Sequence, residues 1–208
     1  HAVYKTAAKE IAAQQGRSIT FMAKYNAREG SSCHIHLSLR GEDGELVFWD
    51  EDAGTRSALY DHFVAGVLAT VADFTLLYAP NINSYKRFAL GSFAPTAIAW
   101  GQDNRTCAVR LVGHGASARM ENRVPGADVN PYLALAAMLA GGLHGIEHEL
   151  PLEDELVGNA YSSDKPHVPS TMAEARERFA SSSVARTTFG DEVVDHYVNM
   201  ADVELAAY

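Results

Sequence analysis

Arg119-Met120-Glu121-Asn122-Arg123, followed at once by Val124-Pro125-Gly126-Ala127-Asp128 and Asn130-Pro131-Tyr132, is the stretch that decides the fold. If residues 119–124 form a strand, its period of two puts Arg119, Glu121 and Arg123 on one face. Two interpretations fit this face. Its charges could pair in water or among themselves, or the carboxylate could bind a divalent metal while the guanidiniums hold anionic oxygens.

A helix is predicted directly after this strand. Asn130 suits the N-cap and Pro131 the first helical position. The pattern continues to about residue 143 and is apolar almost all round, which predicts a buried core helix. The chain therefore passes from a charged strand through a tight turn into the core.

Length and composition exclude several classes of protein. The chain has 208 residues, of which 47% are hydrophobic, enough for one large or two small domains with a substantial core. Its 17 basic and 26 acidic residues give a formal charge of -9, which argues against binding nucleic acid. The longest apolar run is too short to cross a bilayer, and the N-terminal residues carry no signal peptide pattern.

The two cysteines, Cys33 and Cys107, provide neither a disulfide framework nor the paired spacing of a zinc site, so a reducing cytoplasm fits best. Both ends look interrupted. Residues 2–15 have helical spacing with no capping residue ahead of them, and residues 201–208 stop within a helical pattern. We therefore expect an excised fragment.

Strands and helices alternate irregularly along the chain, which predicts an α+β fold with an antiparallel sheet and covering helices. Strands are expected at 18–23, 33–39, 46–49, 96–100 and 105–111, with a hairpin turn at 41–45. Further helices are expected at 2–15, 55–78, 171–180 and 191–206.

The strand at 33–39 carries a second group of polar residues. Strict alternation puts His34, His36 and Ser38 on one face and apolar residues on the other. Two imidazoles at i and i+2 can share a metal, or one can ligate a metal while the other contacts a nucleotide. The same pattern also fits a polar strand face whose histidines bond to their neighbours.

Three further arginines are candidates for binding anions. Arg87 lies in an aromatic, glycine- and proline-containing loop at 83–95, a composition that often carries function. Arg110 has the opposite parity to the apolar residues of its strand. Arg105 shares their parity, so we place it in the preceding turn.

Together these segments resemble the C-terminal part of the catalytic domain of the glutamine synthetase family. The resemblance covers essentially all of the chain, residues 1–208, and rests on the order of its motifs: Gly30-Ser31-Ser32-Cys33-His34-Ile35-His36, Tyr85-Lys86-Arg87, Asp103-Asn104-Arg105, and residues 119–132. It implies antiparallel strands and helices forming half of an active-site funnel between subunits of a double-ringed homo-oligomer. It also implies that an N-terminal domain and further metal-binding strands precede this chain.

The activity implied is ATP-dependent amide bond synthesis through γ-glutamyl phosphate, with Mg²⁺ or Mn²⁺. By resemblance, His34 and Glu121 bind the metal. The remaining roles divide three ways: His36, Ser38, Arg110 and Arg119 toward the nucleotide, Glu29, Gly30, Arg87 and Arg123 toward the substrate, and Arg105, Arg110 and Arg123 toward the transferred phosphoryl group. Fixed guanidiniums and a metal suit the spread negative charge of phosphoryl transfer.

Two departures from ammonia-using members bear on the acceptor. Phe93 stands where those members have a glutamate that takes a proton from ammonium, and phenylalanine cannot act as a base. Glu29 replaces an asparagine ahead of Gly30. The acceptor expected is therefore a larger or more cationic amine, as in the γ-glutamyl polyamine and glutamate–amine ligases.

Three alternatives remain open at this point: a true glutamate–ammonia ligase, a catalytically inactive member acting in assembly or regulation, and a metal-binding sheet domain using His34 and His36. The fragment alone is expected to be inactive, because the rest of the metal site lies elsewhere.

Overall fold

A computed structural model describes residues 1–89 and 91–208, so Leu90 of the predicted loop lies outside the described residues. Eight α-helices, six strands and two 3₁₀ turns are seen in this part of the chain. In order they are α1 (Ala2–Gln14), β1 (Ile35–Leu37), β2 (Trp49–Asp50), β3 (Thr55–Arg56), α2 (Ala58–Thr70), α3 (Thr75–Tyr78), α4 (Ile82–Tyr85), β4 (Trp100–Gln102), β5 (Val109–Val112), η1 (Gly115–Ser117), β6 (Arg119–Asn122), α5 (Pro131–Glu147), η2 (Ala160–Ser162), α6 (Met172–Ser181), α7 (Ser183–Phe189) and α8 (Asp191–Ala207).

A four-stranded sheet with the order β1-β6-β5-β4 forms one layer of the molecule. β6 pairs antiparallel with both β1 and β5, and β4 adds in parallel to β5. The central strand is the charged stretch at Arg119–Asn122. The predicted α+β class, with a mainly antiparallel sheet and covering helices, is confirmed.

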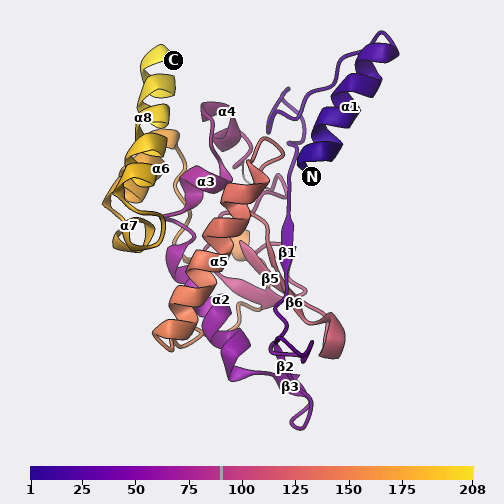
Figure 1. Cartoon of the computed structure of the whole chain (residues 1–208), viewed down its shortest axis with the longest axis vertical. Helices are drawn as coiled ribbons and strands as arrows, with labels where there is room; N and C mark the ends of the chain where they lie inside the picture. Colours follow the sequence, from indigo (N-terminus) through magenta and orange to yellow (C-terminus); the bar gives the residue numbers. More distant parts are fainter. Residues whose placement is uncertain (90) are drawn as a thin grey trace.

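Helices α2 and α5 pack against each other beside this sheet (Figure 1). Their close approach depends on glycine: a Cβ at Gly66 of α2 would collide with the backbone of Gly141 and Gly145 on α5. The ring of Phe63 on α2 lies against Gly142 of α5, where a Cβ would collide with it. Sequence reasoning predicted both helices but not their glycine-lined contact.

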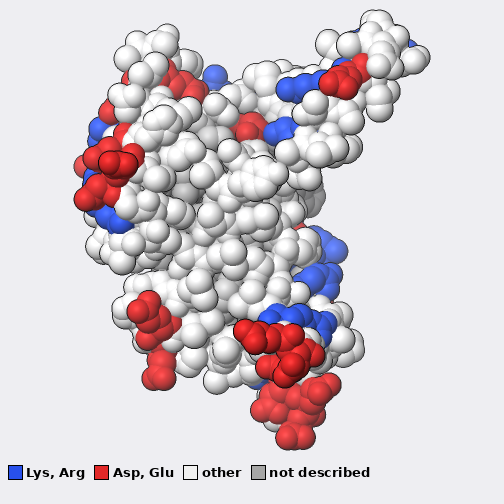
Figure 2. All heavy atoms as spheres, viewed as in Figure 1, with Lys and Arg blue, Asp and Glu red and all other residues white. Residues whose placement is uncertain are grey.

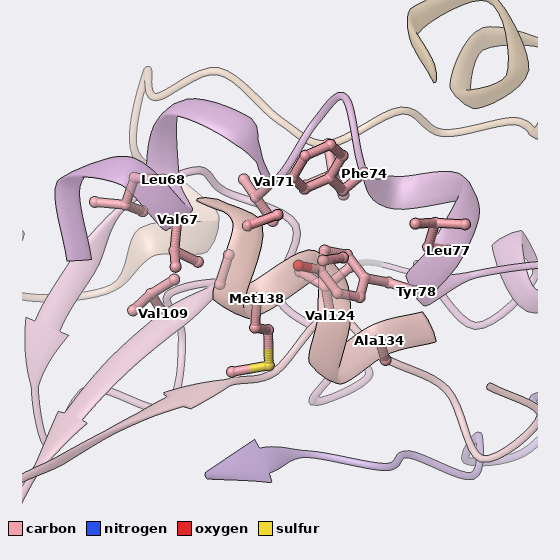
Figure 3. Close-up of a cluster of buried hydrophobic side chains, with 14 of the residues drawn as sticks. Val67, Leu68, Val71, Phe74, Leu77, Tyr78, Val109, Val124, Ala134 and Met138 are labelled. Carbon is pink, nitrogen blue, oxygen red and sulfur yellow. The ribbon is translucent and has the colours of Figure 1, made fainter. Parts of the chain in front are cut away.

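The main core lies between these helices and the sheet. Figure 3 shows side chains from α2, including Val67, pointing toward Met138 of α5 and Val109 of β5. Tyr78 and Val124 extend the cluster to the turn after β6. The core therefore packs against β6 through Met120 and against the turn after it through Val124.

The N-terminal and C-terminal helices lie on opposite sides of the view in Figure 1. α6, α7 and α8 pack together at one side, where Val194 and Phe179 are fully buried. α1 has no buried residue, although Lys5 Nζ donates to Ala127 O at 2.8 Å. No helix in the described part of the chain is long and apolar enough to cross a membrane.

Several predicted elements are wrong. Residues 18–23 form no strand, and the turn at 41–45 does not join β1 to its neighbour, because β2 pairs with β3 instead. The predicted helix at 55–78 is divided into α2 and α3. The strand predicted at 96–100 begins only at Trp100. α7 was missed.

Helix α5 is correctly predicted but is not buried all round. Asn130 caps it by accepting from the Tyr132 backbone N–H at 3.0 Å. However, one face is exposed, with Tyr132, Leu135, Leu139 and Leu143 each about two-fifths or more accessible. An apolar composition alone cannot distinguish a helix buried by its own chain from one with an apolar surface.

Charge is distributed unevenly over the molecule. Figure 2 shows acidic side chains gathered at the end where Figure 1 places β2 and β3. The exposed residue Asp50 ends β2, and the exposed residues Glu51 and Asp52 follow it. Two arginines of the candidate site lie elsewhere, on the sheet: Arg110 in β5 and Arg119 in β6. The overall net charge of -9 therefore does not give the sign of the electrostatic potential at that site.

Candidate active site

Three neighbouring strands bring polar side chains onto one face of the sheet. Glu121 on β6 stands opposite His36 on β1 and opposite Arg110 on β5. Because adjacent strands keep their side chains in step, residues in register on the same face meet. The predicted parity is confirmed for Arg110, whose apolar neighbours Val109 and Leu111 are buried on the other face.

Glu121 is the centre of the resulting cluster. Its side chain is 4% exposed. Oε1 lies 2.7 Å from Arg123 Nη1, 3.1 Å from His34 Nδ1 and 3.6 Å from His36 Nε2. Oε2 accepts from Arg110 Nη1 at 3.1 Å. A buried carboxylate thus has two guanidiniums and two imidazoles around it.

This environment keeps Glu121 ionised. Burial raises the pKa of a carboxyl group, but here the hydrogen bond from His34 and the charge of Arg123 outweigh it. Together with the hydrogen bond from Arg110, they lower the pKa of Glu121 from 4.5 to about 2. At neutral pH the side chain is a carboxylate, the form that binds a metal.

His36 is held as a neutral ring at the edge of the cluster. Arg119 Nε donates to its Nδ1 at 3.2 Å, which leaves the ring proton on Nε2, toward Glu121. Burial lowers the pKa of His36, while Glu121 opposes this and Arg119 adds to it. The Nε2–H of a neutral His36 can donate a hydrogen bond either to a nucleotide or to Glu121.

Arg110 spans the site between two carboxylates. Besides Glu121, its Nη2 donates to Asp103 Oδ1 at 2.7 Å, at the end of β4. Asp103 has a φ of 51°, a left-handed conformation that aspartate tolerates. The sequence analysis included Asp103 in the turn motif with Arg105 but predicted no role for it. The contact with Arg110 appears only in the structure.

Arg87 lies in a separate pocket and is almost completely buried, at 1% exposure. Its Nη1 donates to Ser32 Oγ at 3.0 Å and its Nη2 to Val124 O. Gly30 lies against its aliphatic stem, where a Cβ would collide with Cγ of Arg87. Burial lowers the pKa of Arg87 to about 10, while Asp128 opposes this, so the guanidinium stays charged at neutral pH.

The structure brings the predicted residues together in two groups, one around Glu121 and one formed by Arg87 and Gly30. Arg123 belongs to the first group, and its charge also acts on Arg87. Arg123 follows β6 and is 4% exposed. Its Nη1 bonds to Glu121, while its Nε has no hydrogen-bond partner within the described residues. The first group is around Glu121, and it contains His34, His36, Arg110, Arg119 and Arg123.

Three predicted residues stand outside these groups. Arg105 lies in a turn as expected and is exposed, although its charge is near enough to lower the pKa of Arg123. Glu29 and Ser38 are exposed and take part in no hydrogen bond or ion pair given for the described chain. Glu29 directly precedes Gly30, so it borders the Arg87 pocket.

A divalent metal fits the chemistry of the Glu121 cluster. His34 Nε2 is buried and has no partner among the described residues, while its Nδ1 lies beside the ionised Glu121. The free Nε2 and the ionised Glu121 are each ligands of the kind that divalent metals take, although the Nδ1 of His34, and not its Nε2, faces the carboxylate. Within residues 1–89 and 91–208, no group of three or more His, Cys, Asp or Glu side chains is arranged to hold a metal.

One polar residue at this site was not predicted. Tyr161 lies in η2, and its side chain is partly buried. The charges of Arg123 and Arg87 both act on its phenol. A single tyrosine in a polar loop gave no sequence signal.

Comparison with known proteins places these features in a family. The family model described as glutamine synthetase, catalytic domain, matches residues 1–208. A gamma-glutamylethanolamide synthetase, GlnA4, of Streptomyces coelicolor is 62% identical over 208 residues, which are 100% of this chain and 45% of that protein. A glutamate–isopropylamine ligase of a Pseudomonas species is 44% identical over 203 residues, covering 94% of this chain and 44% of the relative.

Solved structures agree with these sequence matches. A complex of GmaS with ADP, in its first conformation, superimposes with a TM-score of 0.90 at 29% identity, covering 100% of this chain and 50% of the other. The chain thus spans about half the length of the relatives it matches. The family resemblance predicted from the motifs is confirmed.

Proposed function

This chain belongs to the glutamine synthetase family, and from that premise we propose that the full-length protein containing it joins glutamate to an amine. ATP would transfer its γ-phosphoryl group to the γ-carboxylate of glutamate, giving γ-glutamyl phosphate and ADP. The amine nitrogen would then attack the acyl carbon, phosphate would leave, and the nitrogen would lose a proton. The observation that carries this proposal is the convergence of Arg110, Arg123, His34 and His36 on Glu121.

His34 and Glu121 are the residues of this chain that would hold Mg²⁺ or Mn²⁺, with the other ligands coming from water, substrate or the rest of the protein. Such an ion, when bound, polarises phosphoryl oxygens and offsets their charge. Glu121 would also keep Arg110 and Arg123 in place through its two hydrogen bonds.

The arginines would stabilise the charge of the transferred group. Arg110 and Arg123 are anchored by Glu121 and need little reorganisation when charge develops, which is the condition for effective electrostatic stabilisation. Arg105, exposed beside Arg123, would add a third guanidinium. His36 lies on the edge strand β1, Ser38 follows that strand, and Arg119 donates to His36 from β6, and we propose that these three residues contact ATP.

Glutamate would bind at the Arg87 pocket. The guanidinium there is buried and charged, and it forms no ion pair within the described residues, although the charge of Asp128 acts on it. Gly30 lets the chain approach its stem closely. A substrate carboxylate would supply the missing negative charge.

The acceptor we propose is an amine other than ammonia. Phe93 is 70% exposed with a φ of 58°, so the loop position predicted to carry a base in ammonia-using members instead presents an aromatic ring. Two relatives are named for ethanolamide synthesis and for isopropylamine ligation. Homo-oligomer formation by the full-length protein is proposed from the same family membership.

The test is an acceptor panel with the full-length protein. Phosphate release is measured with glutamate, ATP and Mg²⁺, and with ammonia, ethanolamine, isopropylamine, putrescine or spermidine as acceptor. We expect at least one organic amine to give a higher kcat/KM than ammonia. Turnover with ammonia alone would contradict the proposed acceptor, and no turnover with any amine would contradict the proposed function.

A further inference from the structure

Asp128 lies in the turn after β6 and is hydrogen-bonded to the segment that leads to Arg87. Its Oδ2 accepts from Ser84 Oγ at 2.6 Å and from Asn81 Nδ2 at 3.0 Å. Asn81 is the N-cap of α4, and Ser84 lies within that helix at 1% exposure. One carboxylate oxygen thus joins α4 to the turn.

Ser84 continues this connection to Arg87. The backbone N–H of Arg87 donates to the Ser84 carbonyl at 3.2 Å. At the far end of the same side chain, the guanidinium donates to Val124 O, in the turn that carries Asp128. The backbone and the guanidinium of Arg87 are therefore both attached to the turn after β6.

The other oxygen of Asp128 lies close to the guanidinium. A Cβ at Gly126 would lie 2.6 Å from Asp128 Oδ1 and 3.5 Å from Arg87 Nε, and both of those atoms are buried without a hydrogen-bond partner within the described residues. The charge of Asp128 also opposes the fall in the pKa of Arg87 that burial causes. The carboxylate thus places a negative charge beside the guanidinium and leaves its Nη1 and Nη2 to other partners.

We propose that Asp128 is a positioning residue that fixes Arg87 for binding a carboxylate of glutamate, through its hydrogen bonds to Ser84 and Asn81. This inference rests on the proposed function and extends it to a residue of the stretch 119–132 that was not predicted to act. Arginine has a flexible side chain, and holding it in place before the substrate arrives lowers the entropic cost of binding.

A purely structural role for Asp128 would account for the same hydrogen bonds. Such a role would lower the melting temperature and leave the affinity of the folded protein for glutamate unchanged. Glu204 offers a matched control, because its Oε1 accepts from the Ile82 backbone N–H of α4 at 2.7 Å. Glu204 joins α4 to α8, whereas Asp128 joins α4 to the turn that holds the Arg87 guanidinium.

The test compares Asp128→Ala, Ser84→Ala and Glu204→Ala in the full-length protein, by thermal unfolding and by steady-state kinetics with glutamate and ATP varied separately. For Asp128→Ala we expect KM for glutamate to rise about tenfold, because a displaced guanidinium binds the substrate less well. The value of kcat at saturating glutamate and KM for ATP should stay within about twofold of the wild type.

Ser84→Ala removes one hydrogen bond and keeps the charge of Asp128, so KM for glutamate should rise about threefold. Combining it with Asp128→Ala should raise KM no further than Asp128→Ala alone, because the two residues belong to one connection. Glu204→Ala should lower the melting temperature while KM for glutamate stays within about twofold of the wild type.

Wild-type KM for glutamate in either Asp128→Ala or Ser84→Ala would overturn the inference and leave the proposed function intact. An equal rise in Glu204→Ala would also overturn it, because any loosening of α4 would then have the same effect. If Asp128→Ala does not fold, the comparison of Ser84→Ala with Glu204→Ala decides. If the wild-type protein formed no amide with any amine, both the inference and the proposed function would fall.

Discussion

The Glu121 cluster and the Arg87 pocket both contain buried arginine, but they differ in how the positive charge is compensated. Around Glu121, two guanidiniums and two imidazoles share one carboxylate, so the charges are compensated within the protein. Around Arg87, a buried guanidinium donates to a serine hydroxyl and a backbone carbonyl, lies over the ring of Phe88, and feels the charge of Asp128 without pairing with it. The first region has a carboxylate in direct contact with its guanidiniums, whereas no ion pair within the described residues includes Arg87.

This difference predicts how substitutions in the two regions should affect stability and substrate binding. Removing the centre of a compensated cluster leaves buried cations without a partner, so both stability and chemistry suffer. Changing the uncompensated pocket should alter substrate binding more than folding, because its partner is the substrate.

The largest effect is expected for Glu121→Ala. Turnover should fall by about a thousandfold or more, because a metal ligand and the anchor of Arg110 and Arg123 are lost together. Stability should also fall, by about 3–5 kcal/mol, as for other broken buried ion pairs. Phosphate release and denaturant unfolding of the full-length protein measure the two effects.

Asp61→Ala is the matched control for this change, because Asp61 pairs with Arg56 at 2.9 Å but is more exposed. Its effect on stability should lie within about 1 kcal/mol, the usual range for a surface pair. Ordinary turnover by Glu121→Ala would refute the assignment of Glu121.

The second prediction concerns pH. Folding lowers the pKa of Glu121 from 4.5 to about 2, so its ionised form stabilises the native state by about 3 kcal/mol above pH 4.5. That contribution should be lost as the pH falls through the range from 4.5 toward 2. Unfolding of the wild type and Glu121→Gln at several pH values should show the stability gap between them closing in this range. A gap that stays constant with pH would contradict the compensated cluster.

Arg87→Lys should have a smaller effect, confined to one substrate. Lysine keeps the charge but loses the planar fork, so KM for glutamate should rise about thirtyfold while KM for ATP changes little. Steady-state kinetics with each substrate varied separately measures this. Arg176→Lys, at an exposed pair with Asp202, is the control and should behave as the wild type. An equal rise in both KM values would mean that the two regions are not separate.

Sequence reasoning predicted the Glu121 cluster better than its surroundings. Alternation along a strand places Arg119, Glu121 and Arg123 on one face wherever that strand lies, and the family resemblance supplied the partner strand. The strand predicted at 18–23 failed because β-forming residues need a neighbouring strand, and none pairs with them in the described chain. The β2–β3 pairing likewise depended on a partner that local pattern could not identify.

The Arg87 pocket was predicted only in part, for a related reason. Gly30, Arg87 and Tyr161 come from three distant segments, and no spacing in the sequence relates them. Motif resemblance identified the first two. The loop that carries Tyr161 is placed by its contact with the loop at 104–106, which no local sequence pattern reveals.

The smallest effect is expected for Glu29→Gln, at the border of the Arg87 pocket. Glu29 is exposed, so its charge is screened and can act only on a ligand that passes close to it. If it attracts the distal ammonium of a diamine, Glu29→Gln should raise KM for putrescine about two- to fivefold, with no change for isopropylamine, whose tail is uncharged. Added salt should reduce the putrescine difference, because screening weakens exposed charges most. An equal change for both amines, or none for either, would show that Glu29 does not select the acceptor and that selectivity on this side of the site belongs to the loop at Phe93.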